Sequence, residues 1–263
     1  MADSAGSSAE LFAGQDRAVA AANKAIALAP ELPDGYRARG FVRVPIQWDW
    51  AGSRADFERA LALRPDDPET LSDYAYVVLR SQGHIPEAIA FLHKAAEFDP
   101  LNARIWDGIG AVLAIHGERG PAREAFNRSL EISPVQSYTP YHLAVTFLEE
   151  GKPAEALAIS QRSAHEIFRL AGAAEAEHDL GHEKESLQAI DQAIKRWGDI
   201  GAAQIAEVYA WRGDKDRAFE WLERAFRQRD GGLATVKIDP LLRSLHGDPR
   251  FTVLLKKMNL PPD

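Results

Sequence analysis

The 263-residue chain contains no cysteine, which excludes several kinds of chemistry at once. It forms no disulfide, and it has no thiolate to act as a nucleophile or to bind zinc. No stretch approaches the roughly 20 apolar residues of a membrane-spanning helix, and residues 1–8 lack the basic and apolar regions of a signal peptide. We therefore expect neither a disulfide scaffold nor a thiol enzyme nor a membrane protein.

An excess of basic residues is also missing. Lysine and arginine number 31 against 39 aspartates and glutamates, and the formal net charge is −8. This balance argues against direct binding of nucleic acid and against a basic helix on a membrane surface. An acidic surface suits a basic or neutral protein partner, and the 46% of hydrophobic residues allow extensive burial.

Signatures of catalysis are missing as well. His165-Glu166 is not followed by the second histidine of a metalloprotease helix, and the chain has neither a glycine-rich phosphate loop nor a G-x-S-x-G elbow. His178 and His182 have the four-residue spacing that can hold a metal ion on a helix, but Gly181 between them places His182 in a turn. We expect solvated histidines there, and no metal, no cofactor and no enzyme.

What the sequence does contain is a repeat. Gly83, Gly117 and Gly151 are 34 residues apart, and each lies where one helical pattern ends before another begins. Prolines follow almost the same period, at Pro30, Pro65, Pro100 and Pro134. Two independent kinds of helix-breaking residue therefore indicate one repeating helical unit.

The clearest unit spans residues 103–134. Its apolar and small residues recur every three or four positions in two blocks separated by Gly117, which predicts two antiparallel helices. Gly110 and Ala122 are expected where the helices cross closely, with Trp106 and Phe126 filling the wider gaps. Pro134 cannot continue the second helix and ends it.

The pattern W-x2-I-G, then A-x3-F-x2-S, then a closing proline, resembles the tetratricopeptide repeat. Degenerate copies give six full repeats in all, and the copy that begins near Tyr36 carries one extra residue in its interhelix turn, Pro45 to Trp50. The resemblance implies an all-α fold: a right-handed superhelical solenoid of antiparallel helix pairs with a C-terminal helical cap.

Both ends of the array depart from the repeat. Residues 18–230 are expected to hold half a repeat and the six full ones, whereas residues 1–17 are small and polar and are expected to be partly disordered. Either the chain was cut from a longer protein, which we favour, or the native start is frayed. In residues 231–263, Asp239-Pro240 and Asp248-Pro249 read as helix starts that close the last repeat, and Gly231-Gly232 reads as a helix stop.

Two segments resemble the tetratricopeptide arrays of bacterial signalling proteins, namely residues 219–261 and the "WDWAG" at residues 48–52. In those proteins the array follows an adenylate cyclase, winged-helix or kinase domain. This likeness implies a sensory, regulatory or self-association region, located in the cytoplasm or, in a membrane-anchored regulator, in the periplasm. The alternative, which we prefer, is a non-catalytic module that binds a protein or peptide.

In such an array the first helix of each repeat lines a concave groove, so the resemblance also names the residues of a candidate binding surface. One half of the groove mixes aromatic residues with arginine, and the other half is acidic. Any single one of these residues packs against its neighbours more often than it binds, but their clustering favours the set. The carboxylate clamp of chaperone-binding arrays is absent. The candidate residues are Arg37, Phe41, Ser72, Tyr76, Arg80, Arg104, Asp107, Tyr138, Tyr141, Glu175, His178, Asp179 and Glu207.

Overall fold

The computed structural model describes residues 4–135 and 138–261, and its elements are helices joined by short turns, with no strand in those ranges. Twelve helices form six antiparallel pairs. The pairs are α2 (Pro33–Gln47) with α3 (Trp50–Leu63), α4 (Pro68–Tyr74) with α5 (Ile85–Phe98), α6 (Ala103–Ile115) with α7 (Arg119–Ile132), α8 (Thr139–Leu148) with α9 (Pro153–Ser160), α10 (Glu166–Asp179) with α11 (Glu183–Trp197), and α12 (Ala202–Trp211) with α13 (Lys215–Gln228). They confirm the predicted all-α, right-handed tetratricopeptide solenoid.

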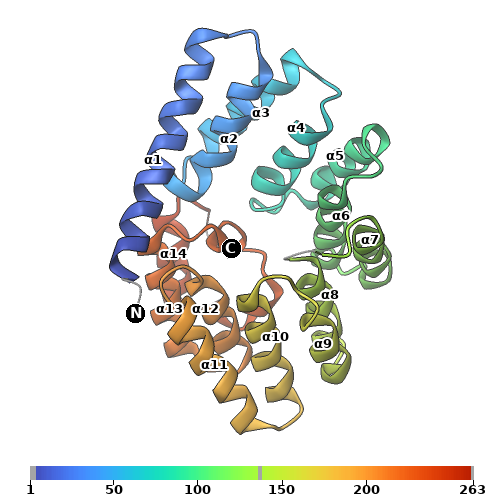
Figure 1. Cartoon of the computed structure of the whole chain (residues 1–263), viewed down its shortest axis with the longest axis vertical. Coiled ribbons are helices and arrows are strands. Elements are labelled where there is room, and N and C mark those ends of the chain that lie inside the picture. The colour runs from blue at the N-terminus through green and yellow to red at the C-terminus, as the bar shows by residue number, and fades with distance from the viewer. Residues whose placement is uncertain (1–3, 136–137, 262–263) are drawn as a thin grey trace.

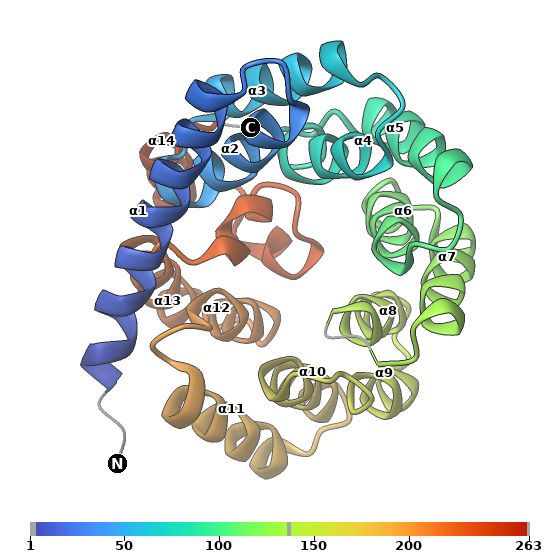
Figure 2. The same cartoon turned by 45° about the horizontal axis from the view of Figure 1, so that its top comes forward.

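The pairs are stacked into a single turn of superhelix (Figures 1 and 2). The first helix of each pair lies on the inside of the turn and the second helix on the outside (Figure 2). The concave face is therefore built by α2, α4, α6, α8, α10 and α12, as the repeat pattern predicts. A π-helical turn, η1 (Ala75–Leu79), extends α4 and was not expected.

The N-terminal segment was expected to be partly disordered over residues 1–17, of which residues 1–3 lie outside the described residues. A single helix, α1 (Ser4–Leu28), begins at Ser4 and packs against α2. The segment is rich in alanine and contains no proline before Pro30, so its helix propensity sustains the helix without the large apolar residues of a full repeat. Within the described residues, α1 joins the array as a single helix that packs against the first pair.

The glycines of the 34-residue period end the first helices of their pairs. At Gly117 the backbone is left-handed, with φ +90°, and the Gly117 amide donates to Ala114 O at 3.0 Å. The same conformation occurs at Gly83, Gly151, Gly181 and Gly213.

The first pair ends its first helix without a glycine. Trp48, with φ 50°, takes the left-handed position, and Asp49 caps α3 by accepting from Gly52 N at 2.9 Å. The turn is therefore Trp48-Asp49, and the predicted turn from Pro45 to Trp50 is wrong because Pro45 belongs to α2. Helix α2 thus ends directly before Trp48, and the next residue, Asp49, caps α3.

Glycine and phenylalanine face each other inside two of the pairs. A Cβ on Gly110 would meet Phe126 ring carbons at 2.6 Å, and one on Gly40 would meet the Phe57 ring at 3.1 Å. Both phenylalanines are fully buried. The predicted close crossing at Gly110 is confirmed, whereas Trp106 is only partly buried and donates its indole N–H to Pro100 O at 2.9 Å.

The C-terminal segment turns back into the superhelix. Helix α13 ends at Arg229, which is left-handed with φ 53°, so the predicted stop at Gly231-Gly232 is displaced by two residues. The chain continues as two 3₁₀ helices, η2 (Gly231–Thr235) and η3 (Pro240–Leu245), and then α14 (Pro249–Lys257). Asp239 and Asp248 accept from the amides of Leu241 and Arg250 at 2.8 and 2.9 Å, which confirms both predicted helix starts.

This segment does more than cover the last repeat. Helix η3 lies on α12 and α14 lies on α13, but η2 also contacts α2. The part with η2 and η3 lies inside the superhelix, whereas α14 lies at its rim beside α13 (Figure 2). At its end the Trp50 indole donates to Met258 O at 2.7 Å, and Asn259 Nδ2 donates to Trp48 O at 3.2 Å. We call this contact between the first pair and the C-terminal end the seam.

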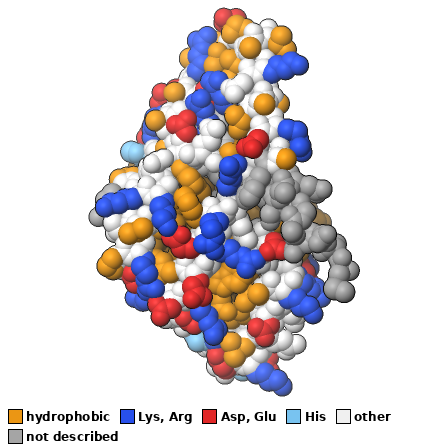
Figure 3. Space-filling model, turned by 90° about the vertical axis from the view of Figure 1, so that its left-hand side faces the viewer, with side chains coloured by type: hydrophobic (Ala, Val, Ile, Leu, Met, Phe, Trp, Pro, Cys, Tyr) orange, Lys and Arg blue, Asp and Glu red, His pale blue; other side chains and the backbone are white. Residues whose placement is uncertain are grey.

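Basic and acidic side chains are intermingled on the face that Figure 3 shows. Ion pairs join α13 to α14 through Lys257 and Glu223 and through Arg250 and Asp216, each at 2.7 Å. Exposed pairs of this kind contribute little individually to stability. They fix the position of α14 rather than create a patch of one sign.

Candidate binding cavity

A cavity of about 860 Å³ lies between the concave face and the C-terminal segment. Its walls come from α2, α4 with η1, α6, α8, α10 and α12 on one side and from residues 230–241 on the other. Nine of the thirteen residues proposed from the sequence line this space. They are Phe41, Ser72, Tyr76, Arg80, Arg104, Asp107, Tyr138, Tyr141 and Glu207.

The other four proposed residues lie outside the cavity wall. Arg37 pairs with Glu69 at 2.8 Å and with Asp73 at 3.1 Å. Glu175 is fully buried behind the wall, where it accepts from the Tyr141 hydroxyl at 2.8 Å.

His178 and Asp179 stand near the end of α10, away from the cavity. His178 lies 3.5 Å from Glu183, and Asp179 accepts from the Trp211 indole at 3.1 Å. The sequence assigned both residues to the inward face of α10, but they lie in its last turn, and the helix ends at Asp179.

The half of the cavity formed by α4 to α8 carries the arginine and aromatic residues. The guanidinium of Arg80 lies over the Tyr76 ring, 3.5 Å from its centroid. Arg104 is paired with Asp73 at 3.1 Å. Tyr138 is 56% exposed, so an aromatic surface is open to a ligand on this side.

A π-helical turn accompanies Tyr76 and Arg80 at the cavity wall. Arg80 N donates to Ala75 O at 2.9 Å, a bond that spans five residues instead of four. Both side chains line the cavity, as their spacing of four residues on a helix predicts. Such turns are rare and are often found at functional sites.

Asp107 is held in its ionised form inside the wall. It lies 3.0 Å from Nδ1 of His142 and also accepts a hydrogen bond from the hydroxyl of Thr139. Burial acts to raise the pKa of Asp107, but His142, Thr139 and the positive charge of Arg80 outweigh burial, and the pKa is lowered.

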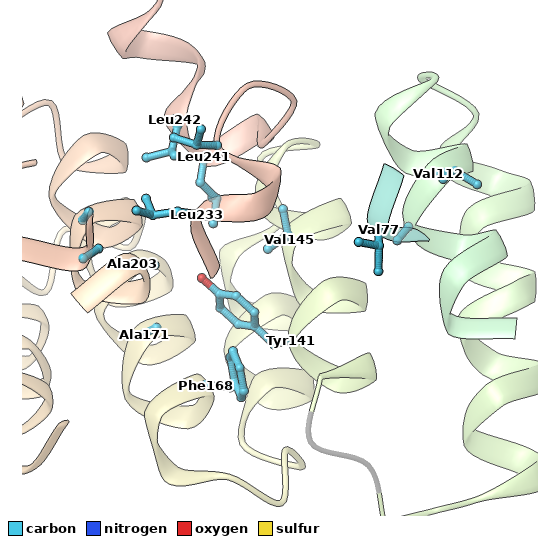
Figure 4. Packing of buried hydrophobic residues seen from close by; sticks show 14 of the residues in the cluster. Val77, Val112, Tyr141, Val145, Phe168, Ala171, Ala203, Leu233, Leu241 and Leu242 are labelled. Atoms are coloured by element: carbon cyan, nitrogen blue, oxygen red, sulfur yellow. The ribbon is translucent and has the colours of Figure 1, made fainter. Parts of the chain in front are cut away.

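The acidic half of the concave face is occupied by the chain itself. The hydroxyl of Tyr141 donates to Glu175 at 2.8 Å and lies 3.2 Å from Glu207, and the Asp239 side chain is hydrogen-bonded to Glu207. Figure 4 shows Tyr141 between α8 and α10, near the C-terminal residues Leu233 and Leu241. Burial raises the pKa of both Glu175 and Glu207 well above the ordinary range.

Asp230 anchors the same segment to α12. Its carboxylate accepts from Ala203 N at 3.0 Å and from Gly232 N at 2.9 Å. The first amides of a helix lack partners within the helix, and Gly201 before α12 offers no side-chain cap. Gly232 lies so near Ala203 that a Cβ on it would come within 2.6 Å of the alanine methyl, so the segment is docked closely.

Several residues of the cavity were not selected from the sequence. Thr139 and His142 directly follow the predicted inward residues Tyr138 and Tyr141, and the repeat pattern alone does not separate them from packing residues. Asp239 and Gly232 were interpreted as parts of a cap. The aspartate cap at Asp239 was visible in the sequence, but its place inside the groove depends on contacts with residues far along the chain.

The described residues contain no group of three or more histidine, aspartate or glutamate side chains arranged to hold a metal ion. His182 Nδ1 is instead 2.7 Å from Glu177. Among the described helices, none combines the length and the apolar character that crossing a bilayer requires.

No family model matches the chain. Human tetratricopeptide repeat protein 13 is 31% identical over 102 residues, which are 39% of this chain and 12% of that protein. Mouse protein O-mannosyl-transferase TMTC1 is 30% identical over 90 residues, 33% of this chain and 10% of that protein. The chain therefore spans about a tenth of the length of these curated relatives.

Solved structures are similar over more of the chain. The Cut9–Hcn1 hetero-tetramer of the APC/C aligns with a TM-score of 0.63 at 16% identity, over 93% of this chain and 46% of that chain. PilW, a type IV pilus biogenesis factor, aligns with a TM-score of 0.61 at 20% identity, over 72% of this chain and 90% of that chain. TTC0263, a tetratricopeptide protein of Thermus thermophilus, aligns with a TM-score of 0.53 at 20% identity, over 69% of this chain and 95% of that chain. These likenesses show the tetratricopeptide fold, and the predicted resemblance to bacterial signalling arrays stays a prediction.

Proposed function

We propose that this tetratricopeptide solenoid is a non-catalytic interaction module that binds a peptide or a narrow segment of a partner protein in the 860 Å³ cavity. The observation that carries the proposal is the division of the concave face. Residues 230–241, which contain η2 and the start of η3, already occupy its acidic half as a closely docked segment, and the half formed by α4 to α8 remains open.

The open half has the properties of a protein interface. Tyr76, Tyr138 and Phe41 offer aromatic surface, and tyrosine and arginine supply much of the binding energy at such interfaces. Apolar residues such as Val77 and Val145 line the space between them. A segment with apolar side chains fits this lining.

The test is a binding measurement with a paired variant. A peptide selected from a display library against the purified chain is measured by calorimetry on the parent protein and on Tyr76→Ala/Tyr138→Ala. We expect the double variant to bind at least tenfold more weakly while its far-ultraviolet circular dichroism is unchanged.

The control is Phe98→Ala, which removes an aromatic residue that is half exposed but lies outside the cavity. Its affinity should equal that of the parent. Equal affinity of the Tyr76/Tyr138 variant and the parent would place the peptide elsewhere and refute the proposal. Tyr141 is unsuited to this test because it is buried between Glu175 and Glu207.

A second candidate function is a sensory or self-association region of a larger signalling protein. The seam favours it, because Trp50 and Met258 join the first pair to the C-terminal end, so a ligand in the cavity contacts elements tied to both ends of the array. Sequencing of the complete gene tests this candidate. A cyclase, kinase or DNA-binding domain on the same chain supports it, and a gene that encodes only this array contradicts it.

A further inference from the structure

Arg80 is an unusual member of the cavity wall. It is 5% exposed, and its Nε atom is enclosed without a hydrogen-bond acceptor. Within residues 4–135 and 138–261 the structure gives its guanidinium no ion pair, and the guanidinium instead stacks on Tyr76. A buried cation without an acceptor is unfavourable for the folded state, so its presence calls for a reason.

The fold does not lack carboxylates in this region, but it engages them elsewhere. Asp73 receives Arg37 and Arg104, each at 3.1 Å. Asp107 is engaged by His142 and Thr139. Within the part of the chain that the structure describes, Nε of Arg80 is therefore left without a hydrogen-bond acceptor at the cavity wall, although the charge of Arg80 still acts on Asp107.

We infer that Arg80 is the binding site for a carboxylate carried by the segment that occupies the cavity. The inference rests on the proposed function and adds the chemistry of the ligand. The planar guanidinium fork matches the two oxygens of a carboxylate, and stacking on Tyr76 fixes the plane while the edge of the fork stays available.

The charges around the site favour a carboxylate over a phosphate. Asp107, Glu207 and Asp239 line the same cavity as Arg80. The positive charge of Arg80 already acts on Asp107 and Asp239, and within the described residues its guanidinium has no ion pair. A group with a single negative charge is therefore repelled less by the ionised Asp107 than a dianion is.

The neighbourhood of Arg80 also limits the rest of the ligand. Val77 and Val145 lie on facing walls of the space between η1 and α8 (Figure 4). Ala111 and Ile115 of α6 add apolar surface. The carboxylate therefore belongs to an acidic side chain or a chain end that is flanked by apolar residues.

The first experiment observes Arg80 directly. Because its Nε atom is enclosed, the attached proton exchanges slowly and gives a resolved ¹⁵N–¹H signal, which Arg80→Met identifies by its loss. Sodium acetate, sodium phosphate and sodium chloride are titrated at equal ionic strength. We expect acetate alone to shift the signal to saturation in the millimolar range. A shift equal to that caused by chloride, or saturation by phosphate alone, overturns the inference.

The second experiment separates the two sources of a carboxylate. The probes are acetyl-Ala-Leu-Ala with a free C-terminus, acetyl-Ala-Leu-Asp-amide and, as the control, acetyl-Ala-Leu-Asn-amide. We expect one or both of the first two to shift the Arg80 signal and the third to leave it unchanged. The identity of the active probe tells whether a chain end or an acidic side chain is recognised. If the asparagine peptide acts as strongly as the others, the charge is irrelevant and the inference fails.

The third experiment uses the library peptide of the proposed function. Arg80→Met should weaken its binding tenfold or more, and Arg128→Met, which removes an arginine of the outer helix α7 that is paired with Glu131 at 3.1 Å outside the cavity, should change it less than twofold. If Arg80→Met does not fold, Arg80→Lys keeps the charge without the fork and should also weaken binding. Weak binding in the Tyr76/Tyr138 variant with full binding in the Arg80 variants refutes the carboxylate site alone. Full binding in all of them refutes the proposed function as well.

Discussion

Gly117 shows how one backbone angle sets the repeat. A Cβ at this position would meet no atom within 4 Å, so the residue is glycine because of its φ of +90° and not because of space. Gly117→Ala should therefore lower the free energy of unfolding by about 1–2 kcal/mol, the cost of a left-handed conformation for a residue with a side chain. Urea denaturation followed by circular dichroism measures the change.

Gly120 provides the matched control three residues later. It has the same open surroundings but lies in α7, with no left-handed angle. Gly120→Ala should raise the free energy of unfolding by about 0.4–1 kcal/mol. Effects of the same sign at both positions would contradict the conformational explanation.

Glu207 links stability to pH. Its pKa is raised by burial and by the nearby Asp239 and Glu175, while the hydroxyl of Tyr141 acts in the opposite direction. The folded chain keeps a proton that the unfolded chain loses above its ordinary pKa, so this contribution to stability is complete below about pH 4 and declines as the pH rises toward the folded pKa.

Glu207→Gln removes that decline, since glutamine does not ionise and its carbonyl still accepts from Tyr141. We expect the variant to unfold with a free energy at least about 1 kcal/mol higher than the parent at pH 8 and nearly equal at pH 4. Thermal unfolding across this range checks the expectation. Glu223→Gln, on the exposed pair with Lys257, should leave the pH dependence unchanged. A parent stability that rises from pH 4 to 8 relative to that of the Glu207→Gln variant would contradict the argument.

At the scale of helices, the Gly110–Phe126 contact sets how closely α6 and α7 cross. Gly110→Ala should lower the free energy of unfolding by about 1–3 kcal/mol, because the new methyl would lie 2.6 Å from a fully buried ring. In a double-mutant cycle, Phe126→Leu should relieve part of that cost, which appears as a coupling energy.

The first pair supplies the comparison. At Gly40 the corresponding distance to Phe57 is 3.1 Å, so Gly40→Ala should cost less than Gly110→Ala. Equal costs, or strict additivity of Gly110→Ala with Phe126→Leu, would show that the ring contact does not determine the effect.

Most of the helices could be predicted from the local sequence. The exceptions, the π-helical turn and the end of α2, have local causes that the repeat pattern does not show. The π-helical turn falls on residues 75–79, "AYVVL", which are as apolar as an ordinary helix, and nothing in their spacing distinguishes a bond over five residues from one over four. Pro45 suggested a turn, yet the end of α2 is determined by Trp48 and by the Asp49 cap. Helix ends of this kind depend on which cap forms.

The cavity was predictable only in part for a related reason. Inward positions follow from the repeat, and most of the residues selected in this way line the cavity. The absence of an acceptor for Arg80 and the burial of Glu175 arise from neighbours on other helices. The placement of residues 230–241 depends on Ala203 and on Glu207, which no local pattern connects to them.

At the scale of the whole molecule, the seam changes the character of the stack. Repeats in an open solenoid contact only their neighbours, so the ends unfold more readily than the middle. Here the Trp50 indole donates to Met258 O, and Trp48 stacks on Phe226 with ring centroids 6.1 Å apart. The first pair and the last pair therefore stabilise each other.

Trp50→Phe tests this coupling by removing the donor and leaving a buried carbonyl without its partner. We expect a loss of about 1–3 kcal/mol and faster amide hydrogen exchange in both α2–α3 and α14. Trp106→Phe is the control, because it removes an indole hydrogen bond to Pro100, which lies only six residues away along the chain. Faster exchange confined to α3 in the Trp50 variant would show that the two ends are independent.

The seam also determines how the molecule responds to a mechanical load. If tension is applied between α1 and α14, the force reaches the contacts of Trp50 with Met258 and of Trp48 with Asn259 before it reaches any contact between consecutive repeats. An open stack of helix pairs begins to extend elastically as soon as force is applied. This solenoid instead keeps its end-to-end length until the seam ruptures, and it then extends repeat by repeat. Its force–extension curve therefore begins with a threshold force.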